Sequence, residues 1–347
     1  MMLRFYSTRC LFASLVTALA CLATSAPAAE PTPLRIVTFN AEILMAPGSR
    51  AGQLQKYRFD FARRQHHERV ADVIEVLRPD ILNLAETTSK ESVDLLIEIL
   101  HEKGLTDYKG YHVDSNDSFT GMDVALITRL EPDVVDGEAI RTYFSGGDDP
   151  TWRQSFSFTG YSGSRQTSTA SISRNSVYFF TVAGRKLGFI GLHLKSNPED
   201  EYSNARRTAE AEVARRIIRG EIVERGYMPI VLGDLNDYDP DVEDRDDTRS
   251  TVTDVIANLK DYDAQKPGPE LVNVAERITR VADRYTSHWD WNENGARDPQ
   301  DVYTMIDHIL LPSELMPYVE QAFIARCVSL DTSDHYPVVV DLKLPAE

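Results

Sequence analysis

The sequence predicts a mixed α/β fold in which β-sheets pack together and helices cover them from outside. Short apolar segments rich in β-branched residues, typical of strands, alternate with segments whose apolar residues recur at helical spacing. Polar residues repeatedly occupy the end or the entrance of the apolar segments. These observations predict a functional site at one edge of the packed sheets.

The N-terminal part of the chain begins with a strand followed by a helix. Residues 34–39, Leu-Arg-Ile-Val-Thr-Phe, have the composition of a strand and end at Asn40. Residues 70–77 then place valine, isoleucine and leucine at helical spacing, and Pro79 ends this helix. We expect the arginine and histidine pairs of residues 63–67 on the solvated face of the same helix.

A second strand follows this helix, because residues 81–84 are apolar and lead to Glu86. A predicted hairpin comes later, with strands at residues 176–182 and 186–194 on either side of Ala-Gly-Arg. Its second strand runs through His193. The strand at 81–84 and the second strand of the hairpin therefore each lead to a polar side chain.

The C-terminal part continues with a helix and three strands. Ser203 opens a long helical pattern, and the apolar residues 229–233 form a strand that ends at Asp234. Residues 305–311 and 336–342 are the two remaining strands. Polar residues again lie at their ends or entrances.

The first 28 residues have the pattern of an export signal. Arg4 and Arg9 precede an apolar run that is too short to span a bilayer, and small residues follow it up to Ala28. We therefore expect a secreted or periplasmic protein without a transmembrane segment. An alternative is a lipoprotein, because Leu-Ala-Cys at residues 19–21 resembles a lipobox that would place a lipid on Cys21.

No repeat or composition break divides residues 29–347, and we expect them to form a single domain. Residues 143–174, rich in Gly, Ser and Thr, and the acidic residues 237–249 are predicted to be loops. Only Cys327 lies outside the predicted signal, which excludes an internal disulfide in the exported chain.

The formal net charge of −17 repels polyanions at long range and argues against tight, nonspecific binding to a nucleic-acid duplex. It does not exclude a nuclease, since carboxylates that bind divalent cations add negative charge themselves. Solubility of an exported protein explains the acidity equally well.

Two motifs combine a carboxylate with another polar group at a strand boundary. Gly-Asp-Leu-Asn-Asp at residues 233–237 places Asp234 and Asn236 on the same side, and Ser-Asp-His-Tyr-Pro at 333–337 places Asp334 beside His335. Hydrolysis of a phosphodiester requires a cation, hydrogen-bond donors and a base that holds water. Oxygen ligands without sulfur favour Mg²⁺, Mn²⁺ or Ca²⁺ over Zn²⁺.

The order and spacing of these and other motifs resemble the endonuclease/exonuclease/phosphatase superfamily of pancreatic deoxyribonuclease type over about residues 34–343. The further motifs are Thr38-Phe39-Asn40-Ala41-Glu42, Leu84-Ala85-Glu86, Gly191-Leu192-His193-Leu194-Lys195-Ser196 and Ile306-Asp307-His308-Ile309-Leu310. The resemblance implies a four-layer α/β/β/α sandwich of two packed mixed β-sheets with helices on both outer faces. It also implies a phosphoesterase with Mg²⁺ or Mn²⁺ at the active site.

The resemblance implies which residues bind the metal and activate water. Glu86 matches the principal metal carboxylate, and Asp234 matches the residue that orients or deprotonates the attacking water. Three further positions match residues near the metal: Asn40, Asp334 and Glu42. Among these, Glu42 stands where relatives vary widely.

The resemblance also implies which residues contact the substrate. Asn236 and His335 match phosphate-binding positions, and Asp307 matches the partner that fixes the tautomer of His335. His193 matches a proton donor to the leaving oxygen. Two cationic side chains are further candidates for contact with the phosphate: Lys195 and Arg174.

Residues 290–301 are a candidate for a second metal site. Oxygen-bearing side chains occupy loop positions 1, 3, 5, 9 and 12: Asp290, Asn292, Asn294, Asp298 and Asp301. With Gly295 at position 6, this is the arrangement of an EF-hand calcium loop, although its last ligand is Asp rather than Glu. The alternative is a polar loop with a glycine turn and no metal.

The sequence leaves three functional hypotheses. An extracellular nuclease would present basic or aromatic side chains beside the site: Trp152, Arg153, Arg165 and Arg174. A sphingomyelinase-like enzyme acting on phospholipid head groups would present an exposed apolar hairpin: Phe156, Phe158 and Tyr161. The third is a catalytically silent calcium-binding domain, which the presence of the whole catalytic set disfavours. No protein partner is indicated.

Overall fold

The computed structural model describes residues 30–50, 52–146, 150–197, 200–246 and 253–346 of the chain. The predicted signal peptide of residues 1–28, which includes Cys21, lies outside these residues. Within them, no helix combines the length and the apolar composition that crossing a membrane requires.

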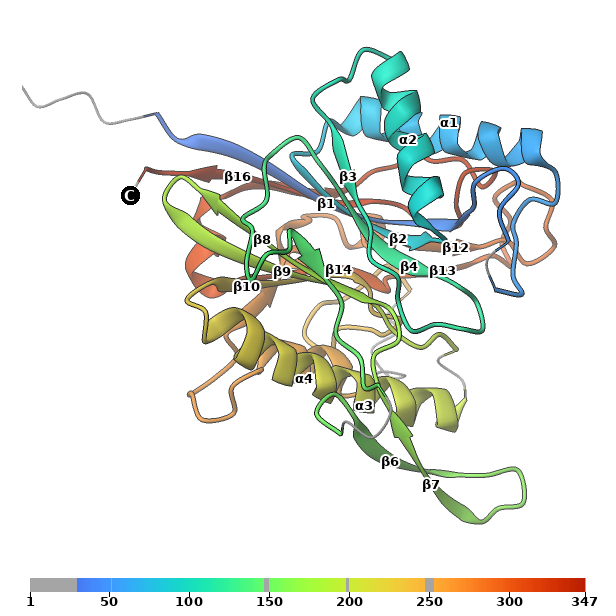
Figure 1. Ribbon diagram of the computed structural model, residues 1–347. Helices are drawn as coiled ribbons and strands as arrows, with labels where there is room; N and C mark the ends of the chain where they lie inside the picture. Colours follow the sequence, from blue (N-terminus) through green and yellow to red (C-terminus); the bar gives the residue numbers. More distant parts are fainter. Residues whose placement is uncertain (1–29, 51, 147–149, 198–199, 247–252, 347) are drawn as a thin grey trace, which may run out of the picture.

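Two six-stranded sheets pack face to face (Figure 1). The first has the order β15 (Val319–Ile324), β16 (Val338–Leu344), β1 (Thr32–Leu44), β2 (Ile81–Thr87), β4 (Asp123–Thr128), β3 (Lys109–Tyr111). The second has the order β11 (Leu271–Asn273), β14 (Asp307–Pro312), β10 (Met228–Asp234), β9 (Arg185–His193), β8 (Asn175–Val182), β5 (Ile140–Arg141). Two-stranded ribbons are formed by β6 (Gln154–Thr159) with β7 (Arg165–Ala170) and by β12 (Ser287–Trp289) with β13 (Val302–Thr304).

Helices cover the outer face of each sheet (Figure 1). The first sheet carries α1 (Asp60–Leu77) and α2 (Lys90–Glu102), and the second carries α3 (Glu201–Ile217) and α4 (Val255–Lys260). Short helical segments complete the described chain: η1 (Ile218–Val223), η3 (Val274–Arg277), η4 (Val281–Asp283) and η5 (Ser313–Tyr318). Both sheets are mixed, since β1 and β2 are parallel and so are β9 and β10. The predicted four-layer sandwich is confirmed.

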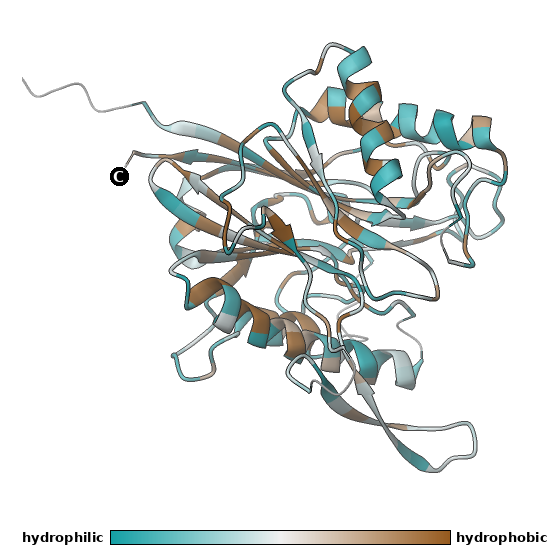
Figure 2. Cartoon of the chain, in the orientation of Figure 1, coloured by the Kyte–Doolittle hydropathy of each residue, from teal (hydrophilic) through white to brown (hydrophobic). Residues whose placement is uncertain are grey.

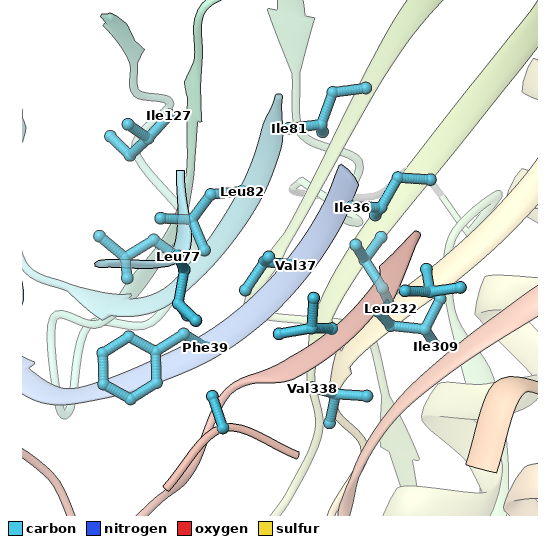
Figure 3. Close-up of a cluster of buried hydrophobic side chains, with 14 of the residues drawn as sticks. Ile36, Val37, Phe39, Leu77, Ile81, Leu82, Ile127, Leu232, Ile309 and Val338 are labelled. Atoms are coloured by element: carbon cyan, nitrogen blue, oxygen red, sulfur yellow. The ribbon is translucent and has the colours of Figure 1, made fainter. Parts of the chain in front are cut away.

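The main core lies between the sheets, and apolar residues concentrate along the central strands (Figure 2). On β1, Ile36 points toward Leu232 and Ile309 of the second sheet, whereas Phe39 lies on the side of Leu77 in α1 (Figure 3). This alternation is the period of two that a strand imposes on its side chains. It decides which polar residues at the strand ends can meet between the sheets.

The predicted hairpin and the predicted end of the first helix are confirmed. Ala183 and Gly184 join β8 to β9 with φ of 52° and 84°, the left-handed conformation that a tight turn between twisted antiparallel strands requires. Helix α1 ends at Leu77, and Arg78 adopts a left-handed conformation before Pro79.

Helix α3 begins two residues earlier than its sequence pattern indicates. The carboxylate of Asp200 accepts a hydrogen bond from the Ser203 backbone N–H at 3.0 Å, so Asp200 is the N-cap and Glu201 the first helical residue. Ser203 itself is buried in the first turn.

The prediction that residues 143–174 form a loop is wrong for Gln154–Ala170. These residues form the β6–β7 ribbon, which extends beside α3 (Figure 1). Phe156 and Phe158 alternate with polar residues along β6 and pack edge-to-face on Tyr202 of α3. The Ser and Thr residues around them are compatible with either state, so composition did not reveal the strands.

The expectation that residues 63–67 are solvated is wrong for Arg63, His66 and His67, which are buried. His66 Nε2 lies 2.7 Å from the carbonyl oxygen of Thr332, and His67 Nε2 lies 2.9 Å from the Ser92 hydroxyl. Burial lowers the pKa of His66 to about 3 and that of His67 to about 4. The histidines therefore act as neutral, hydrogen-bonded packing groups.

Gly233 is the position where the backbone of the second sheet tolerates no side chain. Its φ is 138°, and a Cβ atom there would lie 1.9 Å from the backbone oxygen of Leu192.

We expect Gly233→Ala to lower the free energy of unfolding by about 3 kcal/mol or more, because β9 and β10 must separate. Urea denaturation measures the change. Gly220→Ala, with no atom within 4 Å of the new carbon, is the control; equal stability of both variants would contradict the argument.

Candidate active site

Polar side chains from both sheets meet at the edge where the parallel strands end. Asp234 pairs with His193 on β9 and with Asp307 on β14, and Asn40 lies at the same edge on β1. Alternation places Asn40 on the face of Ile36, toward the second sheet, and Asp234 on the opposing face of that sheet. These side chains therefore point into the space between the sheets.

The amide of Asn40 joins two carboxylates. Its Nδ2 donates to Glu86 Oε1 at 2.9 Å and to Asp234 Oδ2 at 3.1 Å. The second oxygen of each carboxylate accepts a backbone N–H: Glu86 Oε2 from Ile43 at 2.9 Å and Asp234 Oδ1 from Asn236 at 3.0 Å. The amide oxygen of Asn40 accepts the backbone N–H of Glu42 at 2.9 Å. Asn40 thus serves as a hydrogen-bond donor to the site.

A histidine–aspartate pair lies beside the carboxylates. His335 Nδ1 is 2.7 Å from Asp307 Oδ2, and its Nε2 is 3.9 Å from Asp234 Oδ2. Burial opposes the charged imidazole, but the carboxylates of Asp307 and Asp334 outweigh it and raise the pKa of His335 well above its usual value. The predicted pairing of His335 with Asp307 is present, and it leaves Nε2 free to face a substrate.

His193 faces the same carboxylates from β9. Its Nε2 is 3.7 Å from Glu86 Oε1, 3.6 Å from Asp234 Oδ2 and 3.3 Å from Arg174 Nη1. Because a guanidinium only donates, Nε2 accepts that hydrogen bond. Burial, followed by repulsion from Arg174, lowers the pKa of His193. This geometry presents an acceptor at Nε2, so the proton-donor role implied by the resemblance requires a rearrangement around Arg174.

The two buried carboxylates suit a cation. Among the described residues, no lysine or arginine nitrogen lies within 4.0 Å of Glu86 or Asp234. Burial raises the pKa of Glu86, and burial followed by repulsion from Asp307 raises that of Asp234 to about 7. Ligand atoms of Glu86, His193 and Asp234 all lie within 4.8 Å of one another. A divalent cation between Glu86 and Asp234 would favour both ionised carboxylates, and their oxygens fit a hard cation, whereas the Nε2 lone pair of His193 is taken by Arg174.

Several predicted residues occupy the edge without joining this group. Glu42 accepts the backbone N–H of Asp334 at 3.0 Å and forms an ion pair with Lys56. The Asp334 carboxylate is about half exposed, 3.9 Å from His335 Nε2. Asn236 Nδ2 donates to the Leu194 oxygen at 3.2 Å. The structure thus brings Glu86, but not Glu42 or Asp334, to the carboxylate cluster.

The two predicted cationic side chains differ in their surroundings. Arg174 is buried and donates to the Leu194 oxygen at 3.1 Å beside His193. Lys195 is partly exposed, and burial followed by repulsion from Arg206 lowers its pKa. Only Arg174 contacts a residue of the cluster.

The candidate calcium loop connects β12 to β13. Asp290 Oδ2 accepts the Gly295 N–H at 2.6 Å, and the amides of Asn292 and Asn294 donate to Asp298 Oδ2 at 2.8 and 2.7 Å. Asp301 turns inward, with Oδ2 2.7 Å from His288 Nε2. Asn292 and Asn294 thus meet at Asp298, Asp290 bonds to the glycine turn, and Asp301 anchors the loop to β12.

Sequence reasoning missed Thr286, which is fully buried. Its hydroxyl accepts the N–H groups of Ile306 and Asp307 at 3.0 and 2.9 Å, and its carbonyl accepts the Tyr336 N–H at 2.7 Å. Ser287 pairs with His335 across the same ladder. Thr286 therefore fixes both segments that carry the histidine–aspartate pair. A lone threonine far from either motif gives no sequence signal of this role.

Comparison with known families gives one match that spans most of the chain. The model of the Endonuclease/Exonuclease/phosphatase family matches residues 38–335. Comparison with curated proteins finds no match.

Solved structures share the fold at low sequence identity. TDP2 of D. rerio with a single-stranded DNA product is 17% identical, with a TM-score of 0.51 over 89% of this chain and 98% of that one. An endonuclease/exonuclease/phosphatase family protein of Bacteroides thetaiotaomicron is 17% identical, with a TM-score of 0.51 over 91% and 99%. One of Leptotrichia buccalis is 14% identical, with a TM-score of 0.54 over 90% and 100%. These likenesses establish the fold.

Replacement of Thr286 by valine preserves shape and removes the hydroxyl. We expect Thr286→Val to lower the free energy of unfolding by about 2 kcal/mol, since two buried N–H groups lose their acceptor. The NMR signal of the proton between His335 Nδ1 and Asp307 should shift or broaden. Thr286→Ser, which keeps the hydroxyl, should retain both the stability and the NMR signal of the wild type. An unchanged signal in the valine variant would show that Thr286 does not position the His335–Asp307 pair.

Proposed function

The chain belongs to the Endonuclease/Exonuclease/phosphatase family, whose members are divalent-metal-dependent hydrolases of phosphate esters, and on this premise we propose that it is an exported nuclease-like phosphodiesterase. We propose export from the signal-like residues 1–28 and a single domain at residues 29–347. The observation that carries the activity is the cluster of Glu86, His193 and Asp234 facing the His335–Asp307 pair.

The residues divide the chemistry of hydrolysis among them. Mg²⁺ or Mn²⁺ bound at Glu86 would polarise a phosphoryl oxygen and neutralise charge on the phosphate. Asp234, a carboxylate with a raised pKa, accepts the proton of the attacking water. His335, whose pKa is raised, is held as an imidazolium by Asp307, and its Nε2 N–H donates a hydrogen bond to a phosphoryl oxygen. Arg174, beside His193, supplies positive charge near the leaving group.

The surroundings of the site favour nucleic acid over a phospholipid head group. The lipid hypothesis needs an exposed apolar hairpin, but Phe156 and Phe158 of the β6–β7 ribbon pack against Tyr202, and only Tyr161 of the three predicted residues is fully exposed. The fold also accommodates single-stranded DNA in TDP2 of D. rerio. A catalytically silent domain is disfavoured because five of the predicted residues meet at one edge: Glu86, His193, Asp234, Asp307 and His335.

Hydrolysis should depend on Asp234 and His335. We expect Asp234→Asn and His335→Ala each to reduce kcat about 10³-fold with Mg²⁺ or Mn²⁺, since the proton acceptor or the transition-state donor is lost. The assay uses bis-p-nitrophenyl phosphate, plasmid DNA, RNA and sphingomyelin. Asp331→Asn, at an exposed position near the site, is the matched control. Activity that survives both substitutions would mean that the site is misassigned.

We also propose that residues 290–301 bind Ca²⁺ as a structural ion. Besides the sequence pattern, the buried Oδ1 of Asp290 has no hydrogen-bond partner, and Asn292 and Asn294 both bond to Asp298 in the same loop. Since His288 N–H donates to the Asp334 oxygen at 2.8 Å, an ordered loop would brace the segment that carries His335.

Calcium should stabilise the wild-type protein through this loop. We expect Ca²⁺ to raise the melting temperature by about 3 °C or more over chelator, because a ligand that binds only the folded state stabilises it. Asp290→Ala with Asp298→Ala should abolish that increment. Differential scanning fluorimetry in Ca²⁺ and in chelator measures it, and an identical melting temperature of the wild type in both would refute calcium binding.

A further inference from the structure

The connection between β1 and α1, residues 45–59, differs in charge from the rest of the chain. It contains Arg50, Lys56 and Arg58 and no acidic residue, within a chain of net charge −17. Such a segment is locally complementary to a polyanion even though the whole protein is acidic. This positive charge can act on a bound substrate only if the connection lies next to the active site.

The connection borders the candidate active site. Lys56 forms an ion pair with Glu42 and donates to the Leu330 oxygen at 3.1 Å. The hydroxyl of the next residue, Tyr57, donates to the carbonyl oxygen of Asp331. Glu42 also accepts the backbone N–H of Asp334. A substrate bound at the carboxylate cluster can therefore extend onto this connection.

The described residues of the connection line a surface pocket of about 530 Å³ together with Asp60 and Arg63 of α1. Arg63, at one wall, is buried, and its Nε and Nη1 donate to the backbone oxygens of Tyr57 and Ser49 at 2.9 and 3.0 Å. Arg63 thus links two segments of the connection that line the pocket. Arg50 and Arg58 also line the pocket, but they are exposed and form no ion pair within the described part of the chain. These two guanidinium groups are available to a ligand.

Exposed aromatic rings lie beside the arginines. Phe59 and Phe61 are 60% and 68% exposed, and their rings stack at 5.9 Å with an interplanar angle of 15°. The Arg58 guanidinium lies 5.9 Å from the Phe59 ring centre. Phe119, also exposed, belongs to the neighbouring loop, where its carbonyl accepts the Gln53 N–H at 3.0 Å. Exposed rings next to arginine are an arrangement on which unpaired bases stack.

We propose that residues 45–59 bind a single-stranded nucleic acid that extends from the active site, with phosphates on Arg50 and Arg58 and a base against Phe59. The inference rests on the proposed nuclease function. A single strand fits better than a duplex, because only unpaired bases offer their faces to exposed rings. Phosphate contact also explains two arginines without a carboxylate partner in an acidic protein, which a purely apolar ligand would not.

Steady-state kinetics of Arg50→Ala/Arg58→Ala test the proposal. We expect KM for single-stranded oligothymidylate or oligouridylate to rise about ten-fold, and the dependence of log KM on log salt to weaken by about 1.4 units, since each of the two lost phosphate contacts contributes about 0.7 on a single strand. Turnover of bis-p-nitrophenyl phosphate should stay within about two-fold of wild type, because that substrate reaches only the active site. Phe59→Ala should raise KM about five-fold through lost stacking.

Two control variants separate charge from general damage. Arg50→Lys/Arg58→Lys should keep most of the salt dependence, and Arg280→Ala, which removes a side chain that is 76% exposed elsewhere, should leave KM unchanged. Wild-type KM and salt dependence in the double alanine variant would overturn the inference. So would Phe59-dependent binding to sphingomyelin vesicles without any effect on oligonucleotides. Failure of the wild type to hydrolyse bis-p-nitrophenyl phosphate would instead refute the proposed function.

Discussion

The site depends on the burial of two carboxylates, Glu86 and Asp234, that come from different sheets and share one amide. Like charges in a buried position are unfavourable unless their oxygens are hydrogen-bonded and their charge is balanced. Asn40 and two backbone N–H groups give each of the four oxygens a hydrogen bond, and no lysine or arginine of the described chain stands within ion-pair distance of either carboxylate. The charge itself is balanced only in part, by His335 with its raised pKa 3.9 Å from Asp234, and a bound cation would balance the rest. Metal binding and the packing of the two sheets are therefore coupled through Asn40, because its donor groups reach both carboxylates only while the sheets keep their register.

The backbone departs from regular strand geometry at residues that form the carboxylate site. On β2, Asn83 lies on the face toward the second sheet, so regular alternation would direct Glu86 toward the helices. A φ of 62° at Glu86 and a register shift between Ala85 and Thr87 turn the carboxylate back toward Asn40. Asn236 also has a positive φ of 50°. A left-handed residue without glycine costs about 1 kcal/mol, and such strain persists where surrounding contacts enforce it.

These departures explain how far the sequence could predict the site. Apolar runs located the strands, and the polar residues at their ends located the edge at which Asn40 and Asp234 meet. These patterns could not orient Glu86, whose direction comes from a bulge, nor reveal that Lys56 pairs with Glu42 across an irregular connection. Burial of His66 was equally hidden, since it depends on a distant carbonyl, that of Thr332. Residues were predictable where one element determines them and unpredictable where two elements do.

The negative net charge of this chain is compatible with binding of a polyanion, because the net charge acts at long range and the binding contacts act at short range. At 0.1 M salt, charges more than about 10 Å apart are largely screened, so the net charge of −17 mainly slows encounter. Contact is governed by the residues at the edge itself, where residues 45–59 carry only positive charge. The local charge of this connection is therefore compatible with contact to a polyanion although the whole chain is acidic.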